Sequence, residues 1–445
     1  MSRRTAFSAD LQETGVVVGL SHEGAGIVRE GKTALVAGAL PGETVRFRRW
    51  RRHRQYDEAR LEAVLTPAAS RVPPRCAHFE ICGGCALQHL DAASQLALKQ
   101  QQLAENLERI ARLKPQRWLA PIRSPAWGYR RRARLGVKYV PRKGRVLVGF
   151  RERASHLIAQ LARCEVLAAP IGELLTPLAS LIGELSIREQ LPQIEVAVGD
   201  RTAALVLRVL SAPSEEDLGR LRAFEAQYAV RLFLQTGGID TVRSLSEPAA
   251  QLSYALPEAG IDLEFTPTDF IQVNAEANRA LVAAAGDLLE LTAGADVLDL
   301  FCGLGNFSLA LARRAQSVVG VEGEAKLIER ARANAHRNGI GNSEFHQADL
   351  AGQDLSHAPW LKRTYSHLLL DPPRVGAREI LPAIARLAPQ RMLYVSCHPG
   401  TLARDLGILV HEHGFELLAA GVVDMFAHTA HVESLALLGP PRARG

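Results

Sequence analysis

The sequence is poor in cysteine and has no long apolar run. Only six cysteines occur among its 445 residues, and their uneven spacing excludes the disulfide framework of a small secreted protein. No apolar run reaches the roughly 18 residues that a membrane-spanning helix needs, which argues against such a helix. The first residues, MSRRTAFSADLQETG, lack the apolar stretch of a secretory signal. We therefore expect a cytoplasmic protein without membrane contact. We also expect a monomer.

Internal repeats and long low-complexity segments are absent too, which excludes a solenoid and a largely disordered chain. A chain of 445 residues is too long for one core, and its patterns predict three domains. Residues 1–66 hold five short strand-like segments that predict a small closed barrel of the OB type. Residues 67–265 mix strand pairs with polar helices and predict an α+β domain. Residues 266–445 alternate buried strands with helices, which predicts a doubly wound, Rossmann-like α/β domain.

The net charge of +6 is modest, but the basic residues are clustered. One cluster, RFRRWRRHR (46–54), begins on the fourth strand-like segment, and a second, WGYRRRARLGVKYVPRKGR (127–145), lies in the central domain. Arginine pairs with phosphate through two hydrogen bonds and aromatic rings stack on unpaired bases, so this mixture favours RNA over a membrane surface. A solvated strand or loop face remains the alternative for either cluster alone. In the first cluster, the arginines expected to meet RNA are Arg48, Arg49, Arg51 and Arg52.

Four cysteines form a second pattern. Cys76, Cys82 and Cys85 lie close together in CAHFEICGGC, and Cys164 follows far downstream in LARCEVL. Two glycines before the third cysteine let the backbone wrap closely around a bulky inorganic group. Three close cysteines and one distant cysteine are typical of iron–sulfur ligation, whereas Cys₄ zinc sites usually have two CxxC pairs. We predict a [4Fe–4S] cluster, with tetrahedral zinc as the alternative.

The C-terminal domain begins with ADVLDLFCGLGNFSLALA (295–312), a strand followed by a glycine turn and a helix. Glycines after the first strand of such a sheet let a ligand approach the backbone closely. The third glycine that a dinucleotide pyrophosphate would need is missing. Acidic residues recur at the next strand ends, where Glu322 is placed for ribose hydroxyls and Asp349 for an adenine amino group. A ligand with adenosine but without phosphates fits, and we predict S-adenosylmethionine.

A thiol stands at the tip of a later strand of the same sheet. Cys397 ends the buried segment in YVSCHPGT, near LLLDPPR. A thiolate there could add to carbon 6 of uracil, and the resulting enolate is nucleophilic at carbon 5. A base must then remove the carbon-5 proton, and Glu433 is the candidate, with His428 and His431 nearby. The alternative for Cys397 on its own is a buried strand residue, and we expect Cys302 to be a packing residue.

Together these motifs resemble the RNA uracil-C5 methyltransferases that use S-adenosylmethionine. The resemblance covers CAHFEICGGC with Cys164, DFIQVN (269–274), DLFCGLGNFSLALA, LLLDPPRVG, YVSCHPGTLARDL and DMFAHTAHVES, and the N-terminal barrel resembles a TRAM domain. It implies that Cys397 is the nucleophile, that Glu433 is the base, and that the four clustered cysteines are iron–sulfur ligands. The residues that it implies for binding the methyl donor are Gln272, Phe301, Asn306, Glu322, Asp349 and Asp371.

Members of this family differ in domain content. Those that act on the T-loop uridine of transfer RNA lack both the barrel and the cluster, and a second ribosomal RNA enzyme has the cluster without the barrel. This chain has the motifs of both the barrel and the cluster. In this respect it resembles the members that methylate uridine 1939 of bacterial 23S ribosomal RNA. We therefore expect 23S ribosomal RNA as the partner. One departure is His398, which stands where an asparagine is expected after the cysteine.

Other functions fit the motifs less well. A cytosine-C5 methyltransferase typically has a second cysteine after the proline of its DPP-like motif, where this chain has Pro373–Arg374. An enzyme that methylates exocyclic amines would need an aromatic residue after the two prolines. A non-catalytic RNA-binding iron–sulfur protein would have no need for Cys397 and Glu433.

Overall fold

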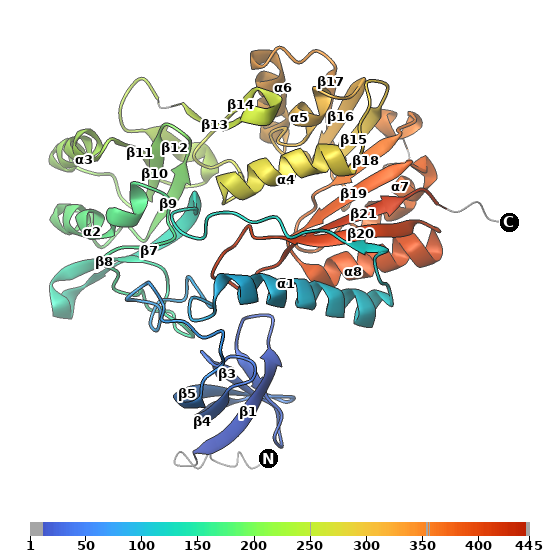
Figure 1. The fold of residues 1–445 in the computed structure, drawn as a ribbon. Coiled ribbons are helices and arrows are strands. Elements are labelled where there is room, and N and C mark those ends of the chain that lie inside the picture. Colours follow the sequence, from blue (N-terminus) through green and yellow to red (C-terminus); the bar gives the residue numbers. More distant parts are fainter. Residues whose placement is uncertain (1–11, 250, 353–354, 356, 442–445) are drawn as a thin grey trace, which may run out of the picture. The chain divides into compact units, whose positions relative to one another are not determined.

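The computed structural model describes residues 12–249, 251–352, 355 and 357–441 (Figure 1). The chain divides into two compact units. The first contains Met1–Lys99 and Phe426–His431, and the second contains Gln100–Met425 and Val432–Gly445. This division differs from the boundaries at residues 66 and 265, which remain a prediction. Within the described ranges, no helix combines the length and the apolar character needed to cross a membrane.

The first unit begins with a closed five-stranded barrel, as the sequence predicted. Its strands are β1 (Glu13–Leu20), β2 (Gly26–Val28), β3 (Ala34–Ala37), β4 (Thr44–Arg52) and β5 (Asp57–Thr66), paired in the order β1-β2-β3-β5-β4. Side chains alternate along β4, so Val45 and Phe47 enter the core whereas Arg46 faces solvent. Closure of the barrel leaves no unpaired strand edge.

A short segment from near the C-terminus belongs to the first unit. The carbonyl of His428 accepts hydrogen bonds from the amides of Ala86 and Leu87, at 2.8 and 2.9 Å. The side-chain oxygen of Gln95, on α1 (Ala92–Asn106), accepts from the amide of His428 at 3.0 Å. The buried ammonium of Lys99 donates to the carbonyl of Phe426 at 2.9 Å. These contacts tie the segment to α1 and to the stretch that follows Cys85.

The second unit contains a six-stranded sheet in its N-terminal half. In sheet order the strands are β12 (Val242–Ser244), β11 (Val230–Gln235), β10 (Ala203–Arg208), β9 (Gln193–Val198), β7 (Arg132–Val140) and β8 (Arg145–Gly149). The pair β9–β10 is antiparallel and confirms one of the strand pairs expected in this region. Two helices pack against this sheet: α2 (Leu175–Glu184) contacts β8, and α3 (Glu215–Tyr228) contacts β11. The latter begins with a capping box, in which Ser214 and Asp217 bond each other's backbone amides.

The C-terminal half contains an eight-stranded, mostly parallel sheet. In sheet order the strands are β17 (Ser343–Gln347), β16 (Ser317–Glu322), β15 (Asp296–Leu300), β18 (His367–Leu370), β19 (Arg391–Ser396), β21 (Glu433–Gly439), β20 (Glu416–Val423) and β6 (Arg117–Trp118). Five parallel strands, from β17 to β19, confirm the doubly wound fold. The antiparallel insertion of β21 between β19 and β20, and the addition of β6, were not predicted.

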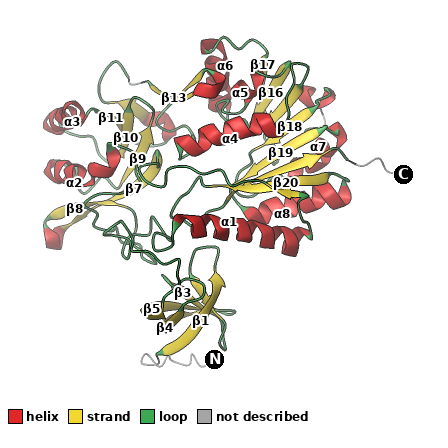
Figure 2. Ribbon diagram, viewed as in Figure 1, coloured by secondary structure: helices red, strands yellow, loops and turns green. Residues whose placement is uncertain are grey.

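Helices lie on both faces of this sheet (Figure 2). They are α4 (Ala275–Leu288), α5 (Ser308–Ala312), α6 (Ala325–Arg337), α7 (Leu381–Leu387) and α8 (Pro399–Gly407), and a hairpin of β13 (Leu252–Leu256) and β14 (Ile261–Phe265) precedes α4. Strand order reverses between β15 and β18, so the connections leave toward opposite sides at this point. Ligands bind at such a switch point, outside the carboxyl ends of the strands.

Candidate active site

The glycine turn after β15 has an unusual backbone. Gly303 and Gly305 have φ angles of +55° and +93°, and Phe301 has a φ of +64° although it is not a glycine. A bulky residue in this region costs about 1–3 kcal/mol, and such strain is concentrated at functional sites. Cys302 is buried, and its sulfur would lie 3.0 Å from a Cβ added to Gly320, so its expected packing role is confirmed. The turn thus brings a strained backbone to the switch point.

Glu322, at the end of β16, is held in one orientation by backbone amides. Its Oε2 accepts from Gly303 at 3.1 Å, and its Oε1 accepts from Gly323 and Glu324 at 2.7 and 3.1 Å. Asp349 follows the neighbouring strand and is exposed, with its Oδ1 accepting from the amide of Ala351 at 2.9 Å. A carboxylate has about four acceptor sites, so both groups keep capacity for hydroxyl or amino donors. The structure brings these two predicted residues to the same sheet edge.

Asn306 is committed to other protein groups. Its amide exchanges two hydrogen bonds of 2.9 Å with the amide of Asn278 on α4, and its oxygen also accepts from the Tyr254 hydroxyl at 2.9 Å. Burial raises the pKa of Tyr254, so the hydroxyl stays a donor. Asn306 therefore anchors the glycine turn to α4 and β13. Neither Asn278 nor Tyr254 lies in a motif, and no signal in the sequence alone pointed to them.

Asp299 is a buried carboxyl group beneath the same turn, with no role predicted. Its Oδ2 accepts from the Ser308 hydroxyl at 2.5 Å, whereas its buried Oδ1 has no hydrogen-bond partner among the described residues. Burial raises the pKa of Asp299 to about 7, against the effect of the Ser308 hydrogen bond, and the nearby charges of Asp371 and Glu322 act in the same direction as burial. The pKa of this buried carboxyl group therefore lies near neutral pH.

Gln272 and Asp371 are hydrogen-bonded to each other at the carboxyl end of β18. The Gln272 amide, in the loop between β14 and α4, donates to Oδ2 of Asp371 at 3.3 Å. Asp371 keeps some solvent exposure, but the protein packed around its carboxylate raises its pKa to about 7. Two segments that lie 99 residues apart in the sequence thus converge on one carboxylate.

Cys397 and Glu433 are brought together by the antiparallel strand. Ser396, the last residue of β19, pairs with Ser434 on β21. Because the two strands are antiparallel, this register places Cys397, which follows Ser396, across from Glu433, which precedes Ser434. Glu433 is only 3% exposed, and both burial and the charge of Asp371 raise its pKa well above the ordinary value. The structure therefore joins a thiol, a buried carboxyl group and Asp371 at one sheet edge.

The thiol of Cys397 is half-buried between charges of opposite sign. Burial raises its pKa to about 11, and the negative charges of Glu433 and Asp371 act in the same direction. Arg374, in the loop after β18, opposes them and lowers the pKa. In the absence of a substrate the thiol is thus protonated at neutral pH, and the guanidinium is the group that favours its ionisation.

His398 caps the helix that follows the thiol. Its ring nitrogen Nδ1 accepts a hydrogen bond from the amide of Thr401 at 3.2 Å, at the N-terminus of α8. An asparagine oxygen would accept the same bond, because asparagine is among the preferred N-cap residues. The departure from the expected asparagine therefore preserves the local geometry. Since Cys397 directly precedes the cap, the positive end of the helix dipole favours its thiolate form.

The cysteines predicted to hold a cluster fall in both units. Cys76, Cys82 and Cys85 lie in the first unit and Cys164 in the second, and all four are half-buried. The sulfur of Cys82 accepts from the amide of Gly84 at 3.4 Å, which suits a thiolate ligand. Across the described parts of the chain, no group of three or more Cys, His, Asp or Glu side chains is arranged to hold a metal ion. Four soft sulfur donors fit an iron–sulfur group chemically, and the assignment remains a prediction.

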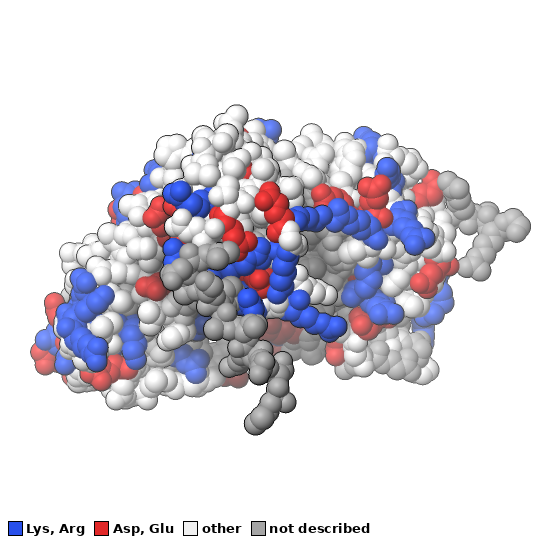
Figure 3. Space-filling view, turned by 90° about the horizontal axis from the view of Figure 1, so that it is seen from below, with Lys and Arg blue, Asp and Glu red and all other residues white. Residues whose placement is uncertain are grey.

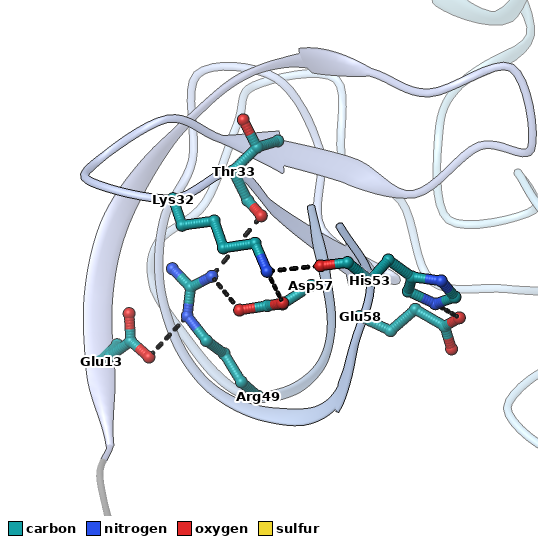
Figure 4. A network of polar contacts seen from close by, with 7 residues as sticks. All are labelled: Glu13, Lys32, Thr33, Arg49, His53, Asp57 and Glu58. Atoms are coloured by element: carbon teal, nitrogen blue, oxygen red, sulfur yellow. Dashed lines mark hydrogen bonds and ion pairs between the residues drawn. The ribbon is translucent and has the colours of Figure 1, made fainter. Parts of the chain in front are cut away.

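The first basic cluster is only partly available to a ligand. Arg49 is 11% exposed and is bound to Glu13 at 2.8 Å and to Asp57 at 3.1 Å, while Lys32 reaches the same aspartate at 2.6 Å (Figure 4). The expectation that Arg49 faces RNA is therefore wrong, because its guanidinium is part of the barrel. The exposed residues of the cluster are Arg46, Trp50, Arg51, Arg52 and Arg54, and Arg60 of β5 lies over the Trp50 ring at 5.3 Å.

The second basic cluster contains both structural and exposed residues, and the exposed ones are Arg134, Lys138, Arg142, Lys143 and Arg145. Arg131 pairs with Asp200 at 2.6 Å, and the half-buried Arg132 donates to the carbonyls of Val196 and Pro267. Burial lowers the pKa of Arg132. Figure 3 shows one face of the molecule, turned by 90° from Figure 1, on which Lys and Arg side chains lie among Asp and Glu side chains. The prediction that this whole cluster faces nucleic acid is therefore wrong for Arg131 and Arg132.

Comparison with known proteins identifies relatives over nearly the whole chain. A family described as tRNA (Uracil-5-)-methyltransferase matches residues 92–440. A protein of Alkalilimnicola ehrlichii named 23S rRNA (uracil(1939)-C(5))-methyltransferase RlmD is 52% identical over 423 residues, which cover 95% of each chain. A protein of the same name from Nitrosococcus oceani is 48% identical, with 99% of this chain and 98% of the relative covered.

A solved structure has the same fold. The crystal structure of Pyrococcus abyssi tRNA (uracil-54, C5)-methyltransferase in complex with S-adenosyl-L-homocysteine matches with a TM-score of 0.75. The match covers 96% of this chain and 99% of the archaeal one at 23% sequence identity. The fold is therefore shared although fewer than a quarter of the aligned residues are identical.

Proposed function

This chain belongs to the RNA uracil-C5 methyltransferase family, and from that premise we propose that it methylates carbon 5 of uridine 1939 in 23S ribosomal RNA with S-adenosylmethionine. The choice of RNA is supported by relatives named for that nucleotide, which are about half identical over nearly the full length of both chains. The chemistry is supported by one observation above all, the antiparallel register that sets Glu433 across from Cys397.

Cys397 begins the reaction by covalent attack. The target base must first leave its stack to reach a strand tip, which costs a few kcal/mol. The partly exposed thiol loses its proton to solvent, and the sulfur electron pair forms a bond to carbon 6 of uracil. The ring π electrons move toward the carbonyl oxygen and leave an enolate that is nucleophilic at carbon 5. The guanidinium of Arg374 and the N-terminus of α8 favour the thiolate that this step requires.

Glu433 completes the reaction as the base. When bound, S-adenosylmethionine would supply an electrophilic methyl group to carbon 5 and leave as S-adenosylhomocysteine. The ionised carboxylate of Glu433 then removes the proton at carbon 5, and the electrons of that bond expel the sulfur from carbon 6. Burial and the charge of Asp371 raise the pKa of Glu433, so its ionised form is a stronger base than an exposed carboxylate.

The methyl donor would lie along the carboxyl ends of β15 to β18. Glu322 would bind the ribose hydroxyls and Asp349 the adenine amino group, which agrees with the remaining acceptor capacity of both carboxylates. The strained turn at Phe301 and the Asn306 amide pair would keep the glycine backbone close to the ligand. The remaining predicted ligands, Gln272 and Asp371, are already bonded to each other at this edge.

The remaining parts of the chain would bind RNA and carry the cluster. The barrel would act as a TRAM domain that docks RNA through its exposed arginines and the Trp50–Arg60 pair. Cys76, Cys82, Cys85 and Cys164 would hold a [4Fe–4S] cluster, and iron–sulfur chemistry favours Cys₄ sets of this kind. Iron and sulfide near four each per chain, in protein purified without oxygen, would support this, whereas a colourless protein with one zinc would contradict it.

The catalytic proposal is tested with two variants and an RNA fragment that contains uridine 1939. Cys397→Ala should bind RNA and the methyl donor yet form no covalent adduct and no product. Glu433→Gln should attack and accept the methyl group but stall before proton removal, so a methylated protein–RNA adduct should survive denaturing electrophoresis. Normal turnover by the alanine variant would refute the nucleophile, and mass spectrometry of ribosomal RNA from a strain without the gene would identify the target nucleotide.

A further inference from the structure

Asp405 is a fully buried carboxylate for which the chemistry above has no use. It lies on α8, two turns beyond Cys397, and is 0% exposed. Its Oδ2 accepts from the hydroxyl of Tyr394 at 2.7 Å and from the amide of Ala377 at 2.8 Å. Its Oδ1 accepts from Nε of Arg404 at 2.8 Å. A buried carboxylate is costly to keep unless such donors satisfy it, and here one group joins three elements.

Those elements are the ones that surround the thiol. Tyr394 lies on β19, three residues before Cys397, and Ala377 ends the loop that follows β18. The same loop is held to α8 twice more, because the Thr401 hydroxyl donates to the carbonyl of Arg374 at 3.0 Å and the Arg404 guanidinium donates to that of Val375 at 2.8 Å. The loop therefore has a fixed path along the helix that carries the thiol at its start.

Gly376 shows how closely the loop approaches this carboxylate. Its φ is +84°, a conformation that side chains rarely adopt, and a Cβ at this position would overlap with Oδ2 of Asp405. The loop also begins with Asp371 and contains Arg374, whose opposite charges both act on Cys397. The amide of Asp371 is bound to Leu300 at 3.3 Å, so that end is held by the sheet, whereas the Arg374 end is held by α8.

We propose that Asp405 is a positioning residue that fixes the Arg374 end of this loop against the strand and helix of Cys397, and thereby aligns the thiol for attack. This inference rests on the proposed function, in which Cys397 is the nucleophile. Asp405 touches neither RNA nor methyl donor in this role. Its loss would slow the chemical step and leave binding of both substrates nearly unchanged.

The test measures single-turnover methylation at saturating RNA and methyl donor, together with the two dissociation constants. Asp405→Asn replaces a carboxylate oxygen with an NH2 group that faces the donors of Tyr394, Ala377 and Arg404, and it should release the loop. The methyl-transfer rate should then fall about 100-fold, because small misplacements of reacting groups have effects of this size. Both dissociation constants should change less than about twofold. Asp217→Asn is the matched control, since Asp217 is an equally buried carboxylate bound to Ser186 and Ser214 in the central sheet region, and its rate should stay at the wild-type level.

Further variants keep the test decisive if Asp405→Asn fails to fold. Tyr394→Phe removes one of the three donors and should reduce the rate about tenfold with binding retained. Gly376→Ala disturbs the same contact from the loop side, because its Cβ would overlap with Oδ2 of Asp405, and it should also reduce the rate about tenfold with binding retained. A wild-type rate in folded Asp405→Asn, or in Tyr394→Phe if Asp405→Asn fails to fold, would overturn the inference. Equal losses of rate and affinity in these variants would overturn it as well. An inactive Cys397→Ala beside a fully active Asp405→Asn would refute only the positioning role, whereas an active Cys397→Ala would refute the proposed nucleophile itself.

Discussion

The two arginine-rich segments have similar compositions, yet the structure uses them differently. Along β4 of the barrel, Arg46 and Arg51 are exposed while Val45 and Phe47 fill the core. In the second segment, Arg131 and Arg132 are turned into the protein and bind Asp200 and two backbone carbonyls. The number of arginines in a segment therefore says little about nucleic-acid contact, because the neighbouring elements decide where each guanidinium finds its partner.

The physical reason lies in the size of the two structures. The small barrel covers only one face of each strand, so alternate side chains must enter water. Arg49 is the exception, because buried Asp57 needs cationic partners and takes both Arg49 and Lys32. The central sheet is covered by more of the chain, including the segment at Pro267, and arginines there find acceptors inside the protein.

The largest expected effect is structural and concerns the second segment. Arg132→Met should lower the free energy of unfolding by about 3 kcal/mol, because it removes the hydrogen bonds of a half-buried guanidinium to the carbonyls of Val196 and Pro267. Hydrogen exchange of the β7 and β9 amides in the full chain would measure this loss. The salt dependence of RNA binding should stay unchanged. A stable Arg132→Met protein with a weaker salt dependence would place this arginine on the RNA surface after all.

A smaller structural effect is expected in the barrel. Arg49→Met should cost about 2 kcal/mol, since Glu13 loses its partner while Asp57 keeps Lys32. The matched control is Arg51→Met, whose side chain is 61% exposed and 3.7 Å from Glu58, and which should cost less than about 0.5 kcal/mol. Hydrogen exchange of the β4 and β5 amides distinguishes the two variants. Equal stability of both would mean that the Arg49 network contributes nothing.

The smallest effect concerns RNA affinity alone. Arg51→Gln combined with Arg54→Gln should reduce the slope of log affinity against log salt by about 1.5, since each phosphate contact releases less than one counterion. Stability and binding of the methyl donor should not change. Arg220→Gln, on α3, is the matched control and should keep the wild-type slope. An unchanged slope in the double variant would exclude the exposed barrel arginines as the RNA-docking surface.

Much of the fold could be predicted because its signals are local. The five strands of the barrel, the β9–β10 pair and the glycine turn after β15 each follow from short runs of residues. Parallel strands place their carboxyl ends at one edge, so the positions of Glu322 and Asp349 followed from strand order alone. The partners of Asn306 and the clamp at Asp405 could not be predicted, because both join segments that no local pattern connects.

The sequence by itself determined which residues can do chemistry here: a thiol at a strand tip, acidic residues at successive strand ends, and a glycine turn that admits a ligand. Those features depend on residue type and short spacing, so hydrophobic periodicity and turn residues are enough to recognise them. Only the tertiary structure decided that Glu433 faces Cys397, because that meeting depends on β21 entering the sheet antiparallel beside β19. It also decided which arginines stay in water, because a guanidinium is held wherever a carboxylate or carbonyl of another segment satisfies it.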